Sequence, residues 1–523
     1  MLNSFRLRNL RSFPGEDDAP FVDLKPLTVF IGKNSCGKSS FLRSFPLLRQ
    51  SVEAKTTGPI LWYGSYVDFG AFSEAKKHDS KCEVIFFDFK FSLNMEKIYD
   101  PIFRWHRSMK RSPRKGLELT VKLGVTEFKD KTIAKELICI IDGIEYSFHF
   151  EDNRKCLFYI DGKEEAISEE LGHLTTNKFL PLIGHFIKSN TGAGTRFKDD
   201  ALSDYFTNEL YQNLKIYFQG NTSALTIKEG ISRIGIHTRE QIKDTLQKVF
   251  RTNKTFIRNL DKQEDKICEI VYKATVGIAL NDVLNAVNQE IENTFRNVKY
   301  IAPLRATAER YYRHQDLQVD EIDHTGSNLA MLLRSFSISD NEKFSEWTMK
   351  SFGFKVRVEE LGLHYALKIQ TESDVREYNI NDMGFGFSQI LPIVTTIWLE
   401  STRNSTVRRR YMRDNESLIF AIEQPELHLH PEYQARLARM FASVVSESRK
   451  GISKITIIFE THSNTMIDAL GDAIEDGDLS EKDVNIVLFN KEHNSSTTKI
   501  KFSNFNNEGF LEQWPIGFFS GRS

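Results

Sequence analysis

The sequence predicts an α/β protein whose main sheet is interrupted by an antiparallel β meander and a helical lobe. Short apolar runs of strand length alternate with helical patterns near both ends of the chain, which is typical of a layered α/β fold. Between these ends, apolar and polar residues alternate with a period of two, and a helical pattern follows. We therefore expect four regions, of which the first and last complete one sheet: 1–80, 81–163, 164–297 and 298–523.

The composition indicates a globular protein. The chain has 523 residues, 40% hydrophobic and 27% charged, which is enough for two or three packed lobes. Its apolar runs are far shorter than the roughly 20 residues that span a bilayer, and the N-terminus lacks an apolar signal segment. We expect a cytoplasmic protein with no membrane partner. The five cysteines are scattered without a CxxC pair, which predicts reduced thiols rather than disulfides or a zinc site.

Two basic segments, 104–116 and 403–415, stand out against a formal net charge of −1, which gives no general attraction for nucleic acid. Each is consistent with a solvated loop. Each is also consistent with a docking surface for the phosphates of a nucleic acid or for an acidic partner.

The N-terminal region begins with two strand-like stretches, FRLRNL at 5–10 and PLTVFI at 26–31. The second runs into a glycine-rich loop. A helical pattern follows the loop at 39–52, and Pro46 should kink that helix or end its first part.

The middle of the chain divides into a strand-rich and a helix-rich part. Alternation over 81–163 predicts antiparallel strands, with Asp-Gly turns at 142–143 and 161–162. From about 165 to 297 the periodicity predicts a compact helical insert, with no heptad repeat long enough for an extended coiled coil. The last region returns to an α/β layer, with strands predicted at VKYIAP, FKVRVEE, HYALKIQ, SLIFAI, ITIIF and NIVLF.

A phosphate-binding loop is predicted after the second strand. Residues 32–39, GKNSCGKS, match the pattern G-x-x-x-x-G-K-[ST] between a strand and a helix. In such a loop, backbone N–H groups and the helix dipole converge on phosphate oxygens. Lys38 would neutralise the outer phosphates, and the Ser39 hydroxyl would bind Mg²⁺. The residues expected to hold the nucleotide are Gly32, Asn34, Ser35, Cys36, Gly37, Lys38, Ser39 and Ser40.

A carboxylate for the metal is expected on a strand that neighbours the strand of the loop. In SLIFAIEQPELHLHP, five apolar residues precede Glu423, and ligands of parallel sheets bind at the carboxyl ends of the strands. We therefore predict Ser39 and Glu423 as the Mg²⁺ ligands. His428 and His430 are two residues apart and lack a partner cluster, so they do not predict a separate metal site.

A histidine follows another apolar strand, in ITIIFETHSNTMI. A lone histidine is more often structural than functional. Because His462 comes after two phosphate-type motifs, we interpret it as a switch residue that can reach a γ-phosphate.

A second glycine-rich stretch, NINDMGFGFSQILPIV at 379–394, precedes a helix that we expect from about Ser388. A helix N-terminus can donate N–H groups to an anion. Since the chain already has one loop for its own phosphates, this second site suggests a composite site completed by another subunit. The residues expected to contact that nucleotide are Gly384, Gly386, Ser388 and Gln389.

The order of these motifs resembles that of ATP-binding-cassette ATPases of the SMC-like kind, whose head is interrupted by an inserted arm. Six phrases resemble, more closely, a prokaryotic subgroup of AAA-type ATPases found with antiphage defence genes, including the ATPase subunits of Septu and retron-associated systems. They are GSYVDFGAF, YIAPLRATAERYY, GFGFSQILPIV, EQPELHLHP, THS and the terminal WPIGFF. The motifs cover both ends of the chain, while 85–295 matches no pattern of the group.

The resemblance implies a P-loop ATPase head of the ABC/SMC type that uses ATP and Mg²⁺. It implies that Lys38 binds phosphate while Ser39 and Glu423 hold the metal. The stretch Gly384 to Gln389 would cap the nucleotide of a facing subunit, and His462 would sense the γ-phosphate. Such proteins dimerise head to tail around ATP, so we expect a homodimer or a higher oligomer.

One position departs from the family pattern. The residue after the strand carboxylate is usually a glutamate that orients the attacking water, and here it is Gln424. An amide cannot act as a general base, so hydrolysis would depend on Glu426 or be almost absent. We favour a slow ATPase, with Glu423, Gln424, Glu426 and His462 as catalytic candidates, over an inert clamp that senses nucleotide by binding.

No nuclease signature follows the histidine motif. The 60 residues after Ser463 contain neither a spaced set of acidic residues nor a His-Asn-His cluster. A role in defence would therefore need a separate nuclease subunit as partner. Two alternatives stay open: a nucleotide-dependent scaffold with negligible hydrolysis, and a DNA repair clamp.

Overall fold

A computed structural model describes residues 1–94, 116–175, 178–188, 195–313, 319–403, 417–450, 454–492 and 495–512. The chain forms two compact units. The insert unit comprises Met1–Arg6, Lys55–Ile60 and Cys82–Glu292, and the head unit comprises Leu7–Ala54, Leu61–Lys81 and Asn293–Ser523. Apart from Gly116 and Arg403, the two basic segments 104–116 and 403–415 lie outside the described residues, as does the terminal WPIGFF.

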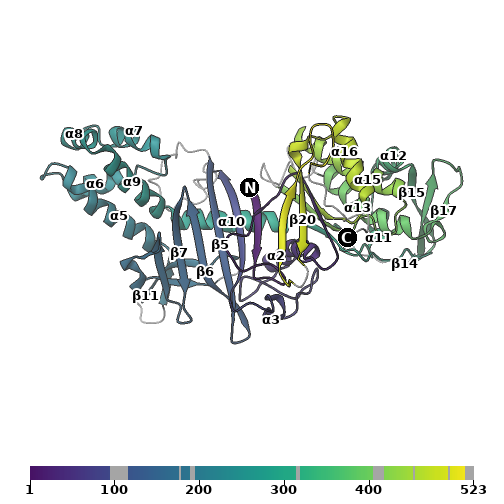
Figure 1. The fold of residues 1–523 in the computed structure, drawn as a ribbon, viewed down its shortest axis with the longest axis horizontal. Helices are drawn as coiled ribbons and strands as arrows, with labels where there is room; N and C mark the ends of the chain where they lie inside the picture. The colour runs from purple at the N-terminus through teal and green to yellow at the C-terminus, as the bar shows by residue number, and fades with distance from the viewer. Residues whose placement is uncertain are drawn as a thin grey trace. The chain divides into compact units, whose positions relative to one another are not determined.

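The head unit is built on a six-stranded sheet that joins the two ends of the chain (Figure 1). In order across the sheet, its strands are β13 (Val298–Ile301), β18 (Ser417–Glu423), β19 (Lys454–Glu460), β3 (Leu27–Gly32), β20 (Val484–Lys491) and β21 (Thr498–Ser503). β3 is parallel to both of its neighbours, β19 and β20. The predicted completion of one sheet by the first and last regions is therefore confirmed. β3 is buried along its whole length, which explains its continuous apolar run.

Helices pack on this sheet and share one apolar core with it. Fully buried core residues come from both layers, including Leu391, Phe441 and Phe459. The helices of the head unit are α1 (Lys38–Leu42), α2 (Ser44–Glu53), α3 (Phe72–Ala75), α11 (Leu329–Arg334), α12 (Ile338–Phe352), α13 (Phe385–Arg403), α15 (Pro431–Lys450) and α16 (Asn464–Glu475). No helix in the described parts of the chain is long and apolar enough to cross a membrane.

The helix after the glycine-rich loop is interrupted at Arg43, between α1 and α2. Pro46 has no N–H to bond the Leu42 carbonyl, and its ring crowds that carbonyl. The predicted break at this proline is therefore confirmed, and it divides the segment into a short first helix and a longer second one.

Two of the strands predicted in the last region belong to a separate sheet. β15 (Phe354–Leu361) and β16 (His364–Thr371) pair antiparallel, and β14 (Tyr312–Arg313) and β17 (Tyr378–Asn379) both pair with β16. The expectation that these runs belong to the main α/β layer is wrong. Their apolar residues alternate with polar ones, and that pattern is typical of an antiparallel sheet that is buried on one face.

The insert unit contains the predicted meander (Figure 1). The strands follow one another in the sheet as β1 (Leu2–Arg8), β4 (Ile85–Asn94), β5 (Gly116–Phe128), β6 (Lys131–Ile141), β7 (Ile144–Phe150), β8 (Cys156–Ile160) and β9 (Lys163–Glu164). From β4 to β9 every successive pair is antiparallel. The Asp-Gly turns are present, with φ of 47° and 84° at Asp142 and Gly143, as a two-residue hairpin of this kind requires.

The region 164–200 contains strands where the sequence analysis predicts helices, so this part of the prediction is wrong. β10 (Gly172–Leu174), β11 (Leu182–Lys188) and β12 (Thr195–Lys198) form an antiparallel sheet. Strands of three to seven residues are too short for their alternation to stand out from a helical pattern. The helical lobe starts at Ala201 and consists of α5 (Ala201–Leu214), α6 (Ala224–Ile231), α7 (Arg239–Val249), α8 (Lys254–Lys262), α9 (Glu264–Ile278) and α10 (Leu280–Arg296).

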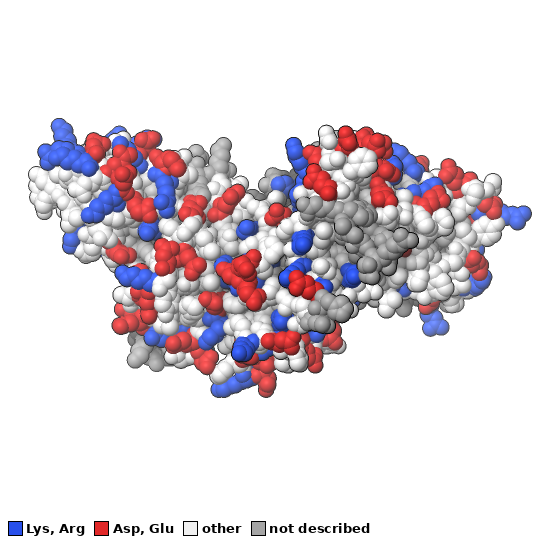
Figure 2. Space-filling view, viewed as in Figure 1, with Lys and Arg blue, Asp and Glu red and all other residues white. Residues whose placement is uncertain are grey.

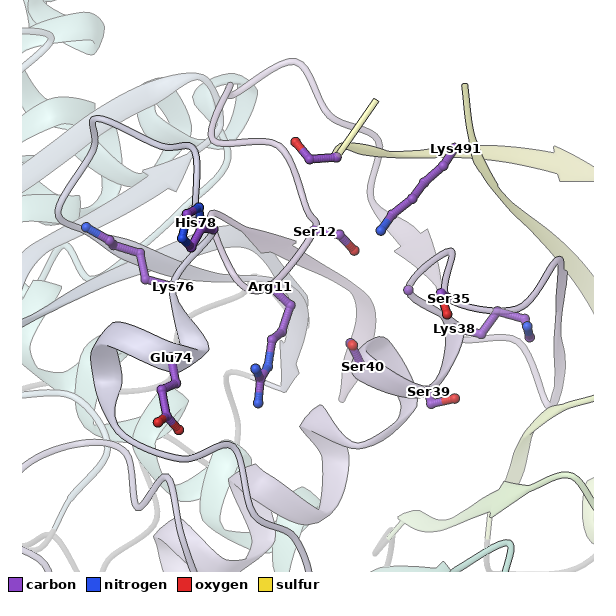
Figure 3. Close-up of a pocket in the computed structure, with 12 residues that line it drawn as sticks. Arg11, Ser12, Ser35, Lys38, Ser39, Ser40, Glu74, Lys76, His78 and Lys491 are labelled. Carbon is purple, nitrogen blue, oxygen red and sulfur yellow. The ribbon is translucent and has the colours of Figure 1, made fainter. Parts of the chain in front are cut away.

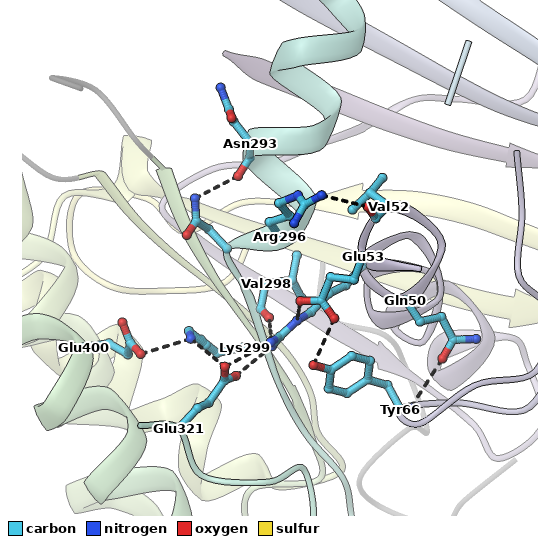
Figure 4. A network of polar contacts seen from close by, with 12 residues as sticks. Gln50, Val52, Glu53, Tyr66, Asn293, Arg296, Val298, Lys299, Glu321 and Glu400 are labelled. Carbon is cyan, nitrogen blue, oxygen red and sulfur yellow. Dashed lines mark hydrogen bonds and ion pairs between the residues drawn. The ribbon is translucent and has the colours of Figure 1, made fainter. Parts of the chain in front are cut away.

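A network of buried charges connects α2, β13 and α13 in the head unit (Figure 4). Lys299 Nζ lies 3.1 Å from a carboxylate oxygen of Glu321 and 3.1 Å from one of Glu400. Arg49 pairs with Glu321 at 2.7 Å and donates to the Val298 carbonyl at 2.6 Å. Burial acts to raise the pKa of Glu321, but Arg49 and Lys299 outweigh it and the pKa is lowered. The network therefore favours the charged form of Glu321.

We expect Lys299→Met to lower the free energy of unfolding by about 3 kcal/mol, because removing one partner of a buried ion pair leaves a poorly compensated charge. Urea unfolding followed by circular dichroism measures this loss. Lys299→Met combined with Glu400→Leu replaces both charges by apolar groups and should recover at least half of it. A double variant that is as unstable as the single one would contradict the explanation.

Candidate functional site

The glycine-rich loop lies between β3 and α1, and its two glycines are required by close approaches. A Cβ on Gly32 would lie 2.3 Å from the Phe489 carbonyl oxygen. Gly37 has a φ of +102°, and a Cβ there would lie 2.8 Å from Thr498 Oγ1. The strand, loop and helix context predicted for residues 32–39 is therefore present, with a backbone that other residues would distort.

A strand from the far end of the chain holds the loop in place. Thr498 Oγ1, at the start of β21, donates to the Cys36 carbonyl at 2.8 Å and lies 2.7 Å from Ser12 Oγ. The Cys36 thiol donates to the Lys33 carbonyl at 2.8 Å, and burial raises its pKa. The side chain of Cys36 is thus part of the support under the loop. No sequence pattern pointed to Ser12 or Thr498.

A pocket of about 630 Å³ opens beside the loop, a size suited to a small organic ligand (Figure 3). Its lining residues are Arg11, Ser12, Ser35, Gly37, Lys38, Ser39, Ser40, Glu74, Lys76, His78, Lys491 and Ser496. Five of the predicted loop residues are in this set, while Gly32, Asn34 and Cys36 are not. Arg11, Lys76 and Lys491 bring three cations from three other segments, and the sequence analysis missed all three. A pocket with this charge suits a polyphosphate.

Lys38 lies folded back on the loop and is 4% exposed. Its ammonium donates to the Gly32 carbonyl at 2.8 Å and to the Lys33 carbonyl at 3.0 Å. Both acceptors are neutral, so an anionic phosphate oxygen would form the stronger charge-assisted bond. The ammonium is therefore held next to the place where phosphates would enter.

Ser39 contacts a carboxylate that the sequence analysis did not single out. Its hydroxyl donates toward Glu460 and lies 2.9 and 2.8 Å from the two oxygens of that residue. Glu460 ends β19, which lies between β18 and β3. The expectation that the strand of Glu423 neighbours the strand of the loop is therefore wrong. Burial, followed by the nearby charge of Glu423, raises the pKa of Glu460 to about 7.

Glu423, at the end of β18, is 1% exposed and tightly held. Arg43 Nε donates to Glu423 Oε1 at 2.7 Å and Arg43 Nη2 donates to Oε2 at 2.8 Å. The Tyr300 hydroxyl donates to Oε1 at 2.5 Å. This hydrogen bonding to Glu423 raises the pKa of Arg43, and burial raises the pKa of Tyr300. Arg43 and Tyr300 were also missed, because only the strand order brings them to this carboxylate.

The turn after β18 contains the two residues proposed to control hydrolysis. Gln424 has a φ of +40°. Glu426 Oε1 accepts the His462 N–H at 2.7 Å, while Oε2 is buried and has no hydrogen-bond partner among the described residues. Arg305 lies close by, with Nε and Nη1 equally buried and unpartnered among the residues described. Burial raises the pKa of Glu426 and lowers that of Arg305 to about 10.

His462 is half-buried at the start of the segment that leads into α16. Burial, followed by the charge of Lys38, lowers its pKa, so the imidazole is neutral at neutral pH. The neighbouring Ser463 caps α16 by accepting the Met466 N–H at 3.1 Å and donates to Gln434 at 2.6 Å. The backbone around His462 is therefore fixed on both sides.

The second glycine-rich stretch leads directly into α13, which begins at Phe385, three residues before the predicted start. Gly384 has a φ of +80° and is exposed, as is Phe385. Ser388 and Gln389 are 5% and 4% exposed. Ser388 donates to the Phe385 carbonyl at 2.7 Å, and Gln389 lies 3.5 Å from the Arg305 carbonyl. The stretch is thus exposed at Gly384 and Phe385, half-buried at Gly386 and buried from Phe387 to Ile390.

The comparisons with known proteins agree with this geometry at the level of a family. A model for the family described as AAA ATPase domain matches residues 1–467. The chain is similar to an SMC head domain with an extended coiled coil, bound to the C-terminal domain of ScpA, from Pyrococcus furiosus, at 11% identity, with 96% of each chain covered and a TM-score of 0.34. It is similar to the SMC head domain from Thermotoga maritima at 8% identity, with 96% of this chain and 98% of that chain covered and a TM-score of 0.34.

The chain is also similar to the recombination mediator protein RecF of the RecFOR pathway, at 11% identity, with 96% of this chain and 98% of that one covered and a TM-score of 0.26. Among curated proteins, no significant match was found. The predicted α/β fold class, with an inserted meander and a helical lobe, is confirmed by the strand topology, and the family match identifies an ATPase domain.

Proposed function

Because the chain belongs to the AAA ATPase domain family, we propose that it binds ATP with Mg²⁺ and hydrolyses it slowly, as a dimer that encloses the nucleotide between two heads. One observation carries this proposal. The phosphate loop opens onto a pocket of about 630 Å³ that is also lined by the cations Arg11, Lys76 and Lys491. Converging loop N–H groups and cations are what a triphosphate needs.

Lys38, Ser39 and His462 keep their predicted roles in this proposal. Lys38 exchanges a loop carbonyl for oxygens of the β- and γ-phosphates. Ser39 and a carboxylate at the end of the sheet hold the Mg²⁺, whose usual ligands are hydroxyl and carboxylate oxygens, water and phosphate. His462, neutral and close to the charge of Lys38, donates to or accepts from the γ-phosphate region. The bound metal supplies charge neutralisation for the phosphates.

Hydrolysis is slow in this proposal because Gln424 replaces the usual general base. Glu426 takes that role, since one of its oxygens is free of partners among the described residues and burial raises its pKa. A scaffold with negligible turnover is the alternative that Gln424 favours. Phosphate release from purified protein separates the two, with Lys38→Ala as the blank: release no faster than the blank would favour the scaffold.

The dimer rests on the second glycine-rich stretch. Its exposed N-terminal part would cap the nucleotide of the facing subunit, and ATP would favour the closed dimer because the γ-phosphate touches both subunits. Gly386 can test this, because a Cβ there meets its own chain at no less than 3.6 Å. A larger side chain therefore fits within one subunit.

We expect Gly386→Asp to abolish dimerisation induced by a non-hydrolysable ATP analogue, because it places a negative charge against the partner's phosphates. Light scattering coupled to size-exclusion chromatography measures the mass, and Gly386→Ala is the matched control that should still dimerise. Nucleotide binding by the Gly386→Asp monomer should persist. A Gly386→Asp protein that dimerises like wild type would contradict the proposed enclosure.

The biological setting we propose is an antiphage defence complex in which this ATPase controls a separate nuclease. Support comes from the sequence phrases that resemble those of Septu and retron-associated ATPase subunits. Cells that carry the gene with its genomic neighbours should restrict phage plating, and Lys38→Ala should remove the restriction. Unchanged plating with the intact locus, across a broad phage panel, would argue against defence.

A DNA repair clamp is the remaining alternative. On the face shown in Figure 2, the described Lys and Arg residues are interspersed with Asp and Glu rather than gathered in a continuous basic stripe. The described residues of this face therefore form no continuous basic stripe of the kind that follows a nucleic-acid backbone. Tight DNA binding by the purified chain that weakens steeply with salt would favour it.

A further inference from the structure

The strand order decides which carboxylate stands next to the phosphate loop. β19 is the direct neighbour of β3, and Glu460 pairs in register with Phe30, two residues before the end of β3. Glu423 pairs in register with Glu460 on the far side of β19. Glu460 is therefore one strand away from the loop, and Glu423 is two strands away.

The contact between Ser39 and Glu460 has the spacing of two ligands on one small cation. The Ser39 hydroxyl oxygen lies 2.9 and 2.8 Å from the two oxygens of Glu460. Two adjacent ligands of an octahedral ion with bonds of about 2.05 Å lie about 2.9 Å apart. Ser39 also lines the pocket beside the loop. These oxygens are thus preorganised for a metal that accompanies the phosphates.

The oxygens of Glu423 have other partners. Arg43 donates to both of them and Tyr300 donates to one, at distances between 2.5 and 2.8 Å. A guanidinium bound in this two-pronged way is a strong partner for a carboxylate and repels a second cation. The hydrogen bonds from Arg43 also fix the end of β18. Arg305 adds a hydrogen bond to the Glu423 backbone carbonyl at 2.8 Å.

We propose that Glu460 is the carboxylate ligand of the Mg²⁺ that accompanies the nucleotide, together with Ser39, and that Glu423 is a positioning residue held by Arg43. This inference rests on the proposed function of the same site. The donors fit the ion: Mg²⁺ takes hard oxygen ligands, commonly one or two carboxylates, with phosphate and water completing its shell. With the ion bound, the Ser39 hydroxyl would no longer donate to Glu460, and both residues would offer oxygen lone pairs to the metal.

The test measures metal dependence separately from catalysis. The affinity for a fluorescent non-hydrolysable ATP analogue is measured in EDTA and across a Mg²⁺ titration, and Mn²⁺ occupancy is followed by electron paramagnetic resonance. Glu460→Gln should raise the metal concentration for half-maximal effect about tenfold or more and leave the affinity in EDTA within about twofold. Ser39→Ala should also raise the metal midpoint. The double variant should raise it little further, because both substitutions damage the same metal site.

Glu423→Gln should move the metal midpoint much less than Glu460→Gln does, since its main effect is on the Arg43 pairing. Glu400→Gln is a matched control, because Glu400 is a buried carboxylate that pairs with Lys299. Thermal melting shows whether Glu460→Gln is folded. If it is not, Glu460→Asp is used instead; its side chain is one methylene shorter, so its carboxylate lies farther from Ser39 and Mn²⁺ binding should be weaker than in wild type.

A metal midpoint that moves with Glu423→Gln and not with the Glu460 variants would overturn the assignment. A different result would show that the proposed ATP binding itself is wrong. In that case wild type itself would bind no nucleotide in EDTA or with Mg²⁺.

Discussion

Lys38→Ala is expected to abolish measurable ATP binding. In the structure the ammonium is 4% exposed and donates to two neutral loop carbonyls, which a triphosphate would replace with charged acceptors. Hydrogen bonds to charged groups contribute about 1.5–3 kcal/mol each, so losing two of them weakens affinity by roughly a hundredfold or more. Isothermal titration calorimetry with ATP and Mg²⁺ measures this loss.

The matched control is Lys33→Ala. Lys33 belongs to the same loop, carries the same charge and is exposed, and it is not among the residues that line the pocket. We expect its removal to change ATP affinity less than about threefold, because an exposed charge is screened by solvent and salt. Equal losses in the two variants would mean that the overall charge of the loop, rather than the position of Lys38, determines binding.

Glu426→Gln is expected to lower turnover by about a hundredfold or more, the usual contribution of a positioned general base. The substitution is nearly isosteric, and the amide oxygen of glutamine can still accept the His462 N–H that Glu426 Oε1 accepts at 2.7 Å. The substitution therefore removes the base and keeps the hydrogen bond from the His462 N–H. Phosphate release at saturating ATP measures the effect, and nucleotide affinity should be retained.

Gln424→Ala should lower turnover far less, because it removes an amide that cannot accept the proton of the attacking water. Part of its effect will be conformational, since alanine must adopt the φ of +40° found at Gln424. Gln424→Glu restores the carboxylate usual at this position and should raise turnover above wild type. Equal turnover in Glu426→Gln and wild type would reject the catalytic role of Glu426.

Several features follow from the sequence because they depend on a few neighbouring residues. The phosphate loop is one, since its backbone needs glycine at Gly32 and Gly37 and its chemistry needs the Lys38–Ser39 pair that follows. The break before Pro46 and the Asp-Gly hairpin at Asp142 are others, because a missing N–H and a positive φ act locally. Continuous apolar runs likewise identify β3 and β18, since these strands are buried along nearly their whole length.

The tertiary structure decided which of these pieces meet. Nothing in the local sequence says that β19 lies between β3 and β18, yet this order brings Glu460 to Ser39 and leaves Glu423 to Arg43. The same holds for Thr498, which bonds to the loop from β21, and for Arg11 and Lys491, which line the pocket beside it. Pairing of strands is set by the burial and hydrogen bonding of the whole sheet, and that energy is shared among residues hundreds of positions apart.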